Sequence, residues 1–440
     1  MRRVDDVSTG KQELFEMILG LSQTFWPPLD GRRLFLGFAL LVASGIFIPA
    51  EAQFSNGYSF RREVDIVDAQ VSGGPHTNFP VLIDSTLLYL RTTANGGKVK
   101  NANGYDIIFT SDQAGATQLA HEIEQYDAVT GDVAFWVRIE SLAATTSIYM
   151  FYGNSGIATF QGDVTSNGVT GVWDNDYEGV WHLNEDVVDE ASGATHFDST
   201  SNNNDGIQQG NVEVAAKIAD GQDFDGANDY IEDADGELYL NGLTAFTVSL
   251  WIQSNVTGTD KGFIIGKTPD NKDDVFTIRY DSKGNDGGGT DVIKAAITVS
   301  GQFQEYESAS NVQTTAWQYL TWIWSSGNDQ ALYIDATLDT PTFVGPTRTG
   351  SISGTDRFRI AQGAKNPPNW NGRVDEVRLS SVIRSTPWIE TEYNNQFTPS
   401  TFYLLRAEEF QLTLVKRAFL LDEHPSHLPA CCQKARYLIS

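Results

Sequence analysis

Two stretches of the chain carry oxygen-bearing side chains in a pattern that suits a hard cation. In residues 370–379, polar and apolar residues alternate as along a β-strand, which places Asp375 on the same face as Val377 and Leu379. A carboxylate at the margin of an apolar face needs hydrogen-bond donors or a cation. Residues 198–206 are rich in Asp and Asn and end in glycine. Such loops supply the oxygen ligands that Ca²⁺ prefers, so both stretches are candidate metal ligands.

Each stretch also has an explanation without a metal. Asp375 can pair with Arg373, two residues along the same face. Residues 198–205 can form a solvated turn, and the acid-rich segment 220–237, which has no basic residue, is typical of a solvated surface. The ion pair and the turn therefore stand as alternatives to calcium.

Motifs of hydrolytic enzymes are missing from the sequence. A retaining glycosidase needs two carboxylates about 5 Å apart, which a strand presents in the spacing Glu-x-Asp-x-x-Glu, and this spacing does not occur. Gly-x-Ser-x-Gly, His-Glu-x-x-His and phosphate-binding glycine motifs are missing too. His76, His121, His182 and His196 are scattered, so we interpret them as turn or core residues rather than ligands. The sequence therefore favours a protein that is not an enzyme.

Charge and composition limit the partners and the fold class. The chain has 57 acidic against 30 basic residues, a formal charge of −27, so its surface repels phosphate backbones and nucleic acid is excluded as a partner. Its 40 glycines, with many Asn, Asp, Ser and Thr, separate short apolar runs, and this pattern predicts an all-β protein. Cys431 and Cys432 are the two cysteines and are adjacent, which excludes a disulfide framework or a zinc site.

The N-terminal region has the order of a secretory signal. Residues 1–33 form a polar extension that ends in an arginine pair, the apolar run 34–48 follows, and small residues come next. The run is shorter than the roughly 20 residues that a membrane span needs. We therefore predict a signal peptide at 34–52, a secreted or cell-surface protein, and no membrane span in the mature chain. The alternative is an uncleaved signal that anchors the chain in the membrane.

Residues 53–160 contain short strands separated by Gly, Asn, Asp and Thr turns, as in a β-sandwich. The strings FPVLID, NGYDIIFT, HEIEQYD, FWVRIESL and IYMFYGN closely resemble the uncharacterised family numbered 2341 among domains of unknown function. The resemblance implies a secreted β-sandwich without a known activity. Residues 161–174 are rich in Gly, Ser, Thr and Asn and form a linker, so we expect two units that fold separately.

Residues 175–405 have the motifs of a second β-sandwich. The strings VWHL, DSTSNNNDG, FDGANDYI and GRVDEVRLSSVIRS, in this order, resemble the laminin-G-like, concanavalin A-like jelly rolls of secreted bacterial proteins. The runs 317–324 and 331–335 flank a turn that contains Gly and Asn, and they predict a hairpin that these jelly rolls also have. Residues 406–440 resemble no family, and we expect this tail to be poorly ordered.

In similar laminin-G-like jelly rolls, a cation commonly ties the opening loop to the closing strand. The resemblance therefore implies one structural Ca²⁺ in the second domain. Its predicted ligands are Asp198, Asn203, Asp205 and Asp375.

The jelly-roll fold does not fix a function, because it hosts lectins, adhesins, hydrolases and inert spacers. The sequence favours a non-enzymatic secreted or cell-surface binding or adhesion protein that recognises a glycan or another surface protein through the jelly roll. The first alternative is a polysaccharide-acting hydrolase, with Asp233, Asp235 and Glu237 as candidate carboxylates. The second alternative is a structural spacer in a surface assembly. Nothing in the sequence indicates the oligomeric state.

Overall fold

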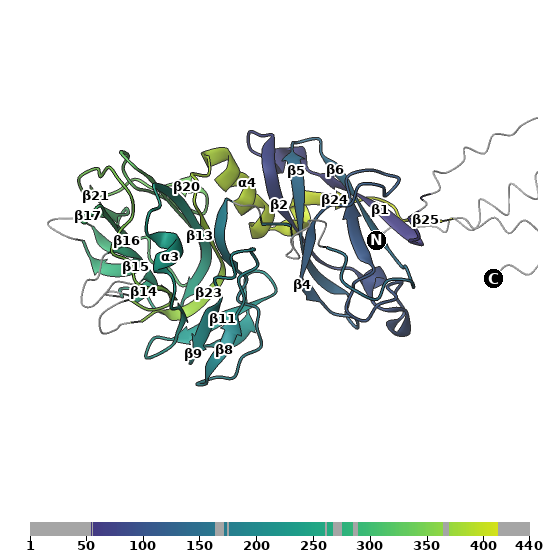
Figure 1. Ribbon diagram of the computed structural model, residues 1–440, viewed down its shortest axis with the longest axis horizontal. Coiled ribbons are helices and arrows are strands. Elements are labelled where there is room, and N and C mark those ends of the chain that lie inside the picture. Colours follow the sequence, from purple (N-terminus) through teal and green to yellow (C-terminus); the bar gives the residue numbers. More distant parts are fainter. Residues whose placement is uncertain are drawn as a thin grey trace, which may run out of the picture. The chain divides into compact units, whose positions relative to one another are not determined.

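The computed structural model describes residues 54–411, with gaps at residue 55 and at segments 163–170, 174–175, 260–261, 267–274, 285–288 and 364–368. The polar extension 1–33, the signal segment 34–52 and residues 412–440 of the expected tail lie outside the described residues. Within the described residues the chain is almost entirely β-structure, as predicted, and it forms two β-sandwiches (Figure 1). No helix in this part of the chain is both long and apolar enough to cross a bilayer.

The first sandwich packs a sheet of order β24-β1-β6-β3, with β25 also on β1, against a sheet of order β2-β5-β4. Alternate residues such as Val64, Phe135 and Ile148 point between the two sheets and form its core. The elements are β1 Phe60–Ile66, η1 Asp68–Gln70, β2 His76–Thr86, η2 Leu88–Leu90, η3 Thr93–Asn95, β3 Ile107–Thr110, β4 His121–Tyr126, β5 Asp132–Leu142, β6 Ser147–Tyr152, β24 Tyr403–Leu405 and β25 Glu409–Phe410.

The second sandwich packs a sheet of order β10-β11-β23-β13-β18-β19-β20, with β7 also on β23, against a nine-stranded sheet of order β21-β17-β16-β15-β14-β22-β12-β9-β8. Phe246, Phe276 and Trp322 meet in its core with ring centroids 4.6 to 5.0 Å apart. The predicted hairpin is confirmed as β18 and β19. The elements are β7 Tyr177–Trp181, β8 Ser192–His196, β9 Gly206–Gln209, β10 Val212–Ala215, β11 Asp220–Asp225, β12 Tyr230–Asp233, α3 Glu237–Leu240, β13 Ala245–Ser254, β14 Gly262–Gly266, β15 Phe276–Lys283, β16 Thr290–Val299, β17 Gln302–Glu307, β18 Trp317–Ser325, β19 Ala331–Ile334, β20 Thr337–Leu338, β21 Phe343–Val344, β22 Phe358–Ile360, β23 Asn371–Ser380, α4 Thr386–Phe397 and α5 Pro399–Phe402.

The chain returns to the first sandwich after α5. β24 pairs antiparallel with β1, Tyr403 opposite Ile66, and β25 continues the ladder with Phe410 opposite Phe60 (Figure 1). Phe402 and Tyr403 are buried in the first core. The sequence predicted that the second sandwich extends to residue 405, so this return was not expected. Residues 409–410 were expected to belong to a poorly ordered tail, but they form a strand. The physical reason is that β1 would otherwise leave one row of backbone N–H and C=O groups unpaired.

Helix α4 contacts both sandwiches. Trp388 at its start packs on Phe79 of β2 with ring centroids 4.7 Å apart. The Asn395 side chain accepts a hydrogen bond from the Leu82 N–H (2.7 Å) and donates one to the Leu82 C=O (3.0 Å). Near its end, the Gln396 amide oxygen accepts a hydrogen bond from Trp251 Nε1 of β13 at 2.7 Å. These contacts tie the expected jelly-roll segment to the core of the first sandwich.

A chain that ends at residue 398 will lose the cooperative unfolding of the first sandwich. The truncation removes Phe402 and Tyr403 from its core, each worth roughly 3–5 kcal/mol when cut to alanine, and it uncovers the edge of β1. Differential scanning calorimetry checks this against a control chain that ends at residue 411. An unchanged melting profile would show that the first sandwich folds without β24 and β25. The linker at 161–174 had led us to expect such separate folding.

β23 contains a β-bulge at Glu376. Two steps along β13, from Ser249 to Trp251, match three steps along β23, from Arg378 to Asp375. Glu376 has a φ of 53°, which is uncommon for a residue with a Cβ. The bulge shifts the alternation of side chains between the two faces of the strand.

This shift turns Asp375 away from the core. Val374, Val377 and Leu379 all belong to the core of the second sandwich, whereas Asp375 pairs with Trp251, whose ring stacks on Tyr393 of α4. The prediction that Asp375 shares a face with Val377 and Leu379 is wrong, because strict alternation does not hold across a bulge.

Candidate functional site

In the loop predicted to bind calcium, the Asp198 and Asp205 carboxylates accept hydrogen bonds from protein groups. Asp198 accepts hydrogen bonds from the backbone N–H groups of Val180, Thr200 and Asn204 at 2.9 Å and from the Thr200 hydroxyl at 2.7 Å. Asp205 in turn accepts from the Asp198 N–H at 2.9 Å. Asn203 is exposed and has a φ of 61°. The structure brings Asp198 and Asp205 together in a hydrogen-bonded turn.

Asp375 lies in a different environment. It is fully buried, and its Oδ2 accepts hydrogen bonds from the backbone N–H groups of Lys217 (3.0 Å) and Ile218 (2.9 Å). No hydrogen bond or ion pair joins it to residues 198–205 in the described part of the chain. Its expected partner Arg373 instead lies 3.9 Å from Asp223, so that alternative is wrong. Calcium binding by these residues stays a prediction. If it is correct, the melting temperature of the protein will fall when a chelator is added.

The side of the nine-stranded sheet that faces away from the core carries a network of buried charges. Arg279, Lys294 and Glu307 lie opposite one another on β15, β16 and β17. The Lys294 Nζ is 3.3 Å from both Asp281 and Glu307, and Arg279 is 3.3 Å from Asp281 and 3.5 Å from Glu305. Each of these side chains is at most 6% exposed. Buried charges of this kind persist when they are paired.

The same side of the sheet continues onto β12 and β22, where it is partly exposed, with the Arg359 and Glu232 side chains 14% and 16% exposed. The guanidinium of Arg359 lies 4.5 Å from the centre of the Tyr230 ring, and its Nε donates to Glu232 at 2.5 Å. Arg357 donates to the other oxygen of Glu232 at 2.8 Å. We call this surface the polar face. Its residues are Tyr230, Glu232, Arg279, Asp281, Lys294, Glu305, Glu307 and Arg359.

The polar face was not predicted from the sequence. The string QFQEYE on β17 places Glu305 and Glu307 on one face by simple alternation, but its spacing differs from the glycosidase pattern. The acids expected for a hydrolase lie elsewhere, because Asp233 ends β12 and its Oδ1 accepts from the Asp235 N–H at 2.9 Å, while Glu237 begins α3.

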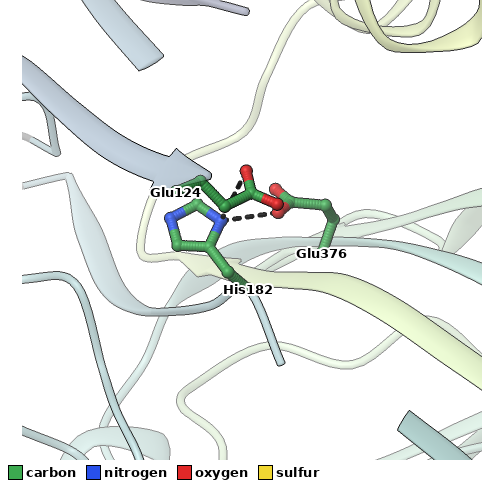
Figure 2. A group of neighbouring side chains, drawn as sticks. All are labelled: Glu124, His182 and Glu376. Atoms are coloured by element: carbon green, nitrogen blue, oxygen red, sulfur yellow. Dashed lines mark hydrogen bonds and ion pairs between the residues drawn. The ribbon is translucent and has the colours of Figure 1, made fainter. Parts of the chain in front are cut away.

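A second cluster of ionisable groups joins the two sandwiches, and we call it the junction cluster. Its members are Glu122 and Glu124 of β4, His182 after β7, and Glu376 in the bulge of β23. Figure 2 shows the Glu124 and Glu376 carboxylates directed at the His182 ring, where Nδ1 lies 2.5 Å from Glu376 Oε1 and 3.7 Å from Glu124 Oε2. The His182 Nε2 lies 3.6 Å from Glu122.

The neighbours decide how the junction cluster is protonated. Burial alone lowers the pKa of His182, but the Glu376 and Glu122 carboxylates raise it well above its usual value. Burial and the Glu376 charge raise the pKa of Glu124 to about 8, although His182 opposes this. Burial alone would raise the pKa of Glu122 and Glu376, but His182 lowers both. At neutral pH the cluster therefore holds a charged His182, a protonated Glu124 and two carboxylates.

The geometry of the junction cluster suits a proton rather than a metal ion. Glu124, His182 and Glu376 are close enough to share an ion, but the 2.5 Å between Nδ1 and Oε1 is a charge-assisted hydrogen bond. Two ligands of one ion, each about 2.0–2.2 Å from it, would lie farther apart. His182 was interpreted from the sequence as a core histidine, and its partners were not predicted because they come from two strands distant in the chain, β4 and β23.

Two family models match parts of the two sandwiches. Residues 103–204 match the domain of unknown function DUF2341, and residues 225–390 match the concanavalin A-like lectin/glucanases superfamily. The chain joins a DUF2341 domain to a concanavalin A-like domain. We use these names for the first and second sandwich. The DUF2341 match runs past the expected boundary at residue 160 and includes His182, so three of the four members of the junction cluster lie within it.

Three solved structures are similar to part of the chain. Domain 4 of an extracellular arabinanase from Geobacillus stearothermophilus, in complex with arabinotriose, is 20% identical over 50% of this chain and 98% of its own, with a TM-score of 0.36. The binding domain of Paraclostridial Mosquitocidal Protein 1 is 13% identical over 50% of this chain and 52% of its own, with a TM-score of 0.39. The receptor binding domain of botulinum neurotoxin mosaic serotype C/D is 13% identical over 50% of this chain and 51% of its own, with a TM-score of 0.38. The chain spans about half the length of these two toxin domains. No curated protein matches the chain.

Tryptophans and an arginine complete the contact between the DUF2341 domain and the concanavalin A-like domain. Trp136 Nε1 donates to Glu124 at 2.6 Å, and Trp173 Nε1 donates to Glu122 at 2.7 Å. The buried guanidinium of Arg378 lies 4.3 Å from the Trp136 ring centre and forms ion pairs with Glu376 and, at 2.8 Å, with Glu392 of α4. An apolar cluster that includes Leu82, Trp136, Trp173, Tyr177, Val180 and Ile218 surrounds these groups.

Proposed function

We propose that this chain is a non-enzymatic secreted or cell-surface protein that binds an extracellular glycan through the polar face of its concanavalin A-like domain. The observation that supports this best is the partly exposed end of that face, where Tyr230 lies under Arg359 beside Glu232. A sugar ring has apolar C–H surfaces and a belt of hydroxyls. An aromatic ring with fixed donors and acceptors next to it complements both.

The rigidity of the polar face adds to its suitability. Glu232 is held by Arg357 and Arg359 together, so its oxygens and the guanidinium groups keep their positions without a ligand. A preorganised surface loses less conformational entropy on binding, which matters for the shallow contacts of a carbohydrate.

A polysaccharide-acting hydrolase is the second candidate, because Glu305 and Glu307 share one strand face with Asp281 nearby. A glycosidase needs one of its two carboxyl groups as a proton donor. In this structure all three carboxylates are ion-pair partners of Arg279 or Lys294. This arrangement favours binding over catalysis.

A glycan array probed with the mature chain tests the proposal. We expect binding to at least one glycan, and Tyr230→Ala and Arg359→Ala should each weaken it at least tenfold, about 1.4 kcal/mol. Arg406→Ala is the matched control, because Arg406 is an exposed arginine paired with Asp65 on the other domain. Equal losses in all three variants, or no glycan bound, would refute the proposed site.

Release of reducing ends from β-glucans, galactans and sulfated polysaccharides tests the hydrolase alternative. We expect no turnover. Activity that disappears in Glu305→Gln or Glu307→Gln would instead establish an enzyme.

A further inference from the structure

Three side chains in the buried part of the polar face have the chemistry needed for an internal amide bond. They are Asp281 of β15, Lys294 of β16 and Glu307 of β17. The Lys294 Nζ lies 3.3 Å from Asp281 Oδ2 and 3.3 Å from Glu307 Oε1. A lysine amine can attack a carboxyl carbon, and a second carboxylate beside the amine can accept the proton that must leave it.

Strand register brings these three side chains together. Lys294 lies directly opposite Glu307 in the pairing of β16 with β17. On its other side it lies opposite Arg279 of β15, two residues before Asp281 on the same face of that strand. Diagonal neighbours on one sheet face are about 7–8 Å apart, which is within the reach of a long side chain. The contact between Lys294 and Asp281 therefore forms whenever the sheet forms.

Water is nearly excluded from these groups. The side chains of Asp281, Lys294 and Glu307 are 5%, 2% and 0% exposed. Burial favours an amide over the separate ions, because condensation releases a water molecule and removes two charges from a buried site. Amine and carboxyl groups held in contact also react without a collision, which is worth an effective concentration of up to about 10⁵–10⁸ M.

The two oxygens of Asp281 have different partners. Oδ1 accepts a hydrogen bond from the Lys283 backbone N–H at 3.0 Å. Oδ2 faces the Lys294 Nζ and the Arg279 Nε, each at 3.3 Å. A backbone N–H on Oδ1 stabilises the negative charge that develops there when an amine attacks Cγ. Oδ1 is therefore placed to become the oxygen of an amide, and Oδ2 is placed to leave.

We propose that Lys294 and Asp281 form an intramolecular isopeptide bond, with Glu307 as the proton carrier. Glu307 takes a proton from the Lys294 ammonium, and the free amine attacks Asp281 Cγ. The bond from Nζ to Cγ forms and the bond from Cγ to Oδ2 breaks. Oδ2 leaves as water with two protons of the former ammonium, one of them returned by Glu307, while the remaining proton stays on the amide nitrogen. The net charge is unchanged, and no other reactant is required.

Such a bond would give the concanavalin A-like domain a covalent cross-link of a kind that its cysteine content rules out. The only two cysteines of the chain, Cys431 and Cys432, lie outside both sandwiches, so neither sandwich can contain a disulfide. An isopeptide bond between β15 and β16 is not opened by reducing agents.

The mass of the folded mature chain tests the proposal. We expect a mass lower than that of the sequence by one water molecule, with or without a reducing agent. Trypsin cleaves after Lys and Arg, so it should release residues 280–283 still attached to the peptide that contains Lys294. Tandem mass spectrometry of that product should place the link between Asp281 and Lys294.

Lys294→Arg and Glu307→Gln should each restore the full sequence mass. A guanidinium stays charged and is not a nucleophile, and a glutamine amide does not accept the lysine proton. Lys283→Arg is the matched control, because it replaces an exposed lysine near Asp281 and keeps the backbone N–H, so the water should still be lost.

The wild-type mass decides the proposal even where a variant fails to fold. A folded wild-type chain with its full sequence mass overturns the proposal, and so does a lost water that maps to other residues. A link that forms as completely in Glu307→Gln as in the wild type overturns the role of Glu307.

Discussion

Raising the pH from 6 to 8.5 will destabilise the protein, and the junction cluster is the cause. Folded Glu124 keeps its proton up to about pH 8, whereas the unfolded chain loses it near 4.5. Folded His182 stays charged well above its usual 6.5. The unfolded state therefore binds fewer protons, and each group removes about 1.4 kcal/mol of unfolding free energy per pH unit in its range. Urea denaturation at several pH values measures this.

Glu124→Gln should remove the contribution of Glu124 to this slope. A glutamine keeps an oxygen that accepts from Trp136 Nε1 but holds no titrating proton. Glu140→Gln, at an exposed position on β5, is the control and should leave the slope unchanged. The pKa values of Glu122 and Glu376 are lowered, so their effect on stability has the opposite pH dependence. The stability that these two carboxylates contribute is lost as the pH falls below 4.5. A stability that is flat between pH 6 and 8.5 would contradict the assignment.

Arg378→Met will reduce the free energy of unfolding by about 3–5 kcal/mol, the range for removing one partner of a buried ion pair. The change leaves Glu376 and Glu392 without their shared cation in a buried site. Urea unfolding at pH 6 gives the value. Arg406→Ala removes an exposed arginine from a surface pair and should cost about 0–1 kcal/mol.

Replacing Glu376 and Glu392 by neutral residues tests whether their unpaired charges cause the loss of stability in Arg378→Met. Adding Glu376→Gln and Glu392→Gln to Arg378→Met should recover part of the lost stability, because no buried charge then lacks a partner. If the triple variant is less stable than Arg378→Met alone, packing of Arg378 between the tryptophans matters more than its charge.

The sequence was sufficient to predict the fold class and both families, because these depend on local patterns. Strand alternation and turn residues fall within a few positions of each other, as in the hairpin of β18 and β19. The motif strings pointed to the same two families that residues 103–204 and 225–390 match. The return of β24 to β1 was not predicted, because a three-residue strand gives too short a pattern to reveal a partner so distant in the chain.

The sites were predicted less well, because they depend on single-residue changes and on distant pairings. One bulge residue, Glu376, was enough to turn Asp375 away from the face that alternation assigned to it. The bulge position is a glutamate rather than a glycine, so the sequence does not indicate a bulge there. The junction cluster assembles residues from β4, from the position after β7 and from β23, and none of these segments contains a metal or catalytic motif. The polar face had a local signal in QFQEYE, but two acids on one strand face do not indicate a function by themselves.

The pairing of β24 and β25 with β1 decides how the protein would respond to tension. Phe60 lies opposite Phe410, and Val64 lies opposite Leu405, so the two ends of this ladder leave from the same side. A pulling force between residues 59 and 411 would open the hydrogen bonds one after another, starting at Phe60, rather than shear them all together. The concanavalin A-like domain lies in the chain between β6 and β24. It would therefore bear no load until both short strands had peeled from β1, and a pulled molecule would lengthen first by the opening of its DUF2341 domain.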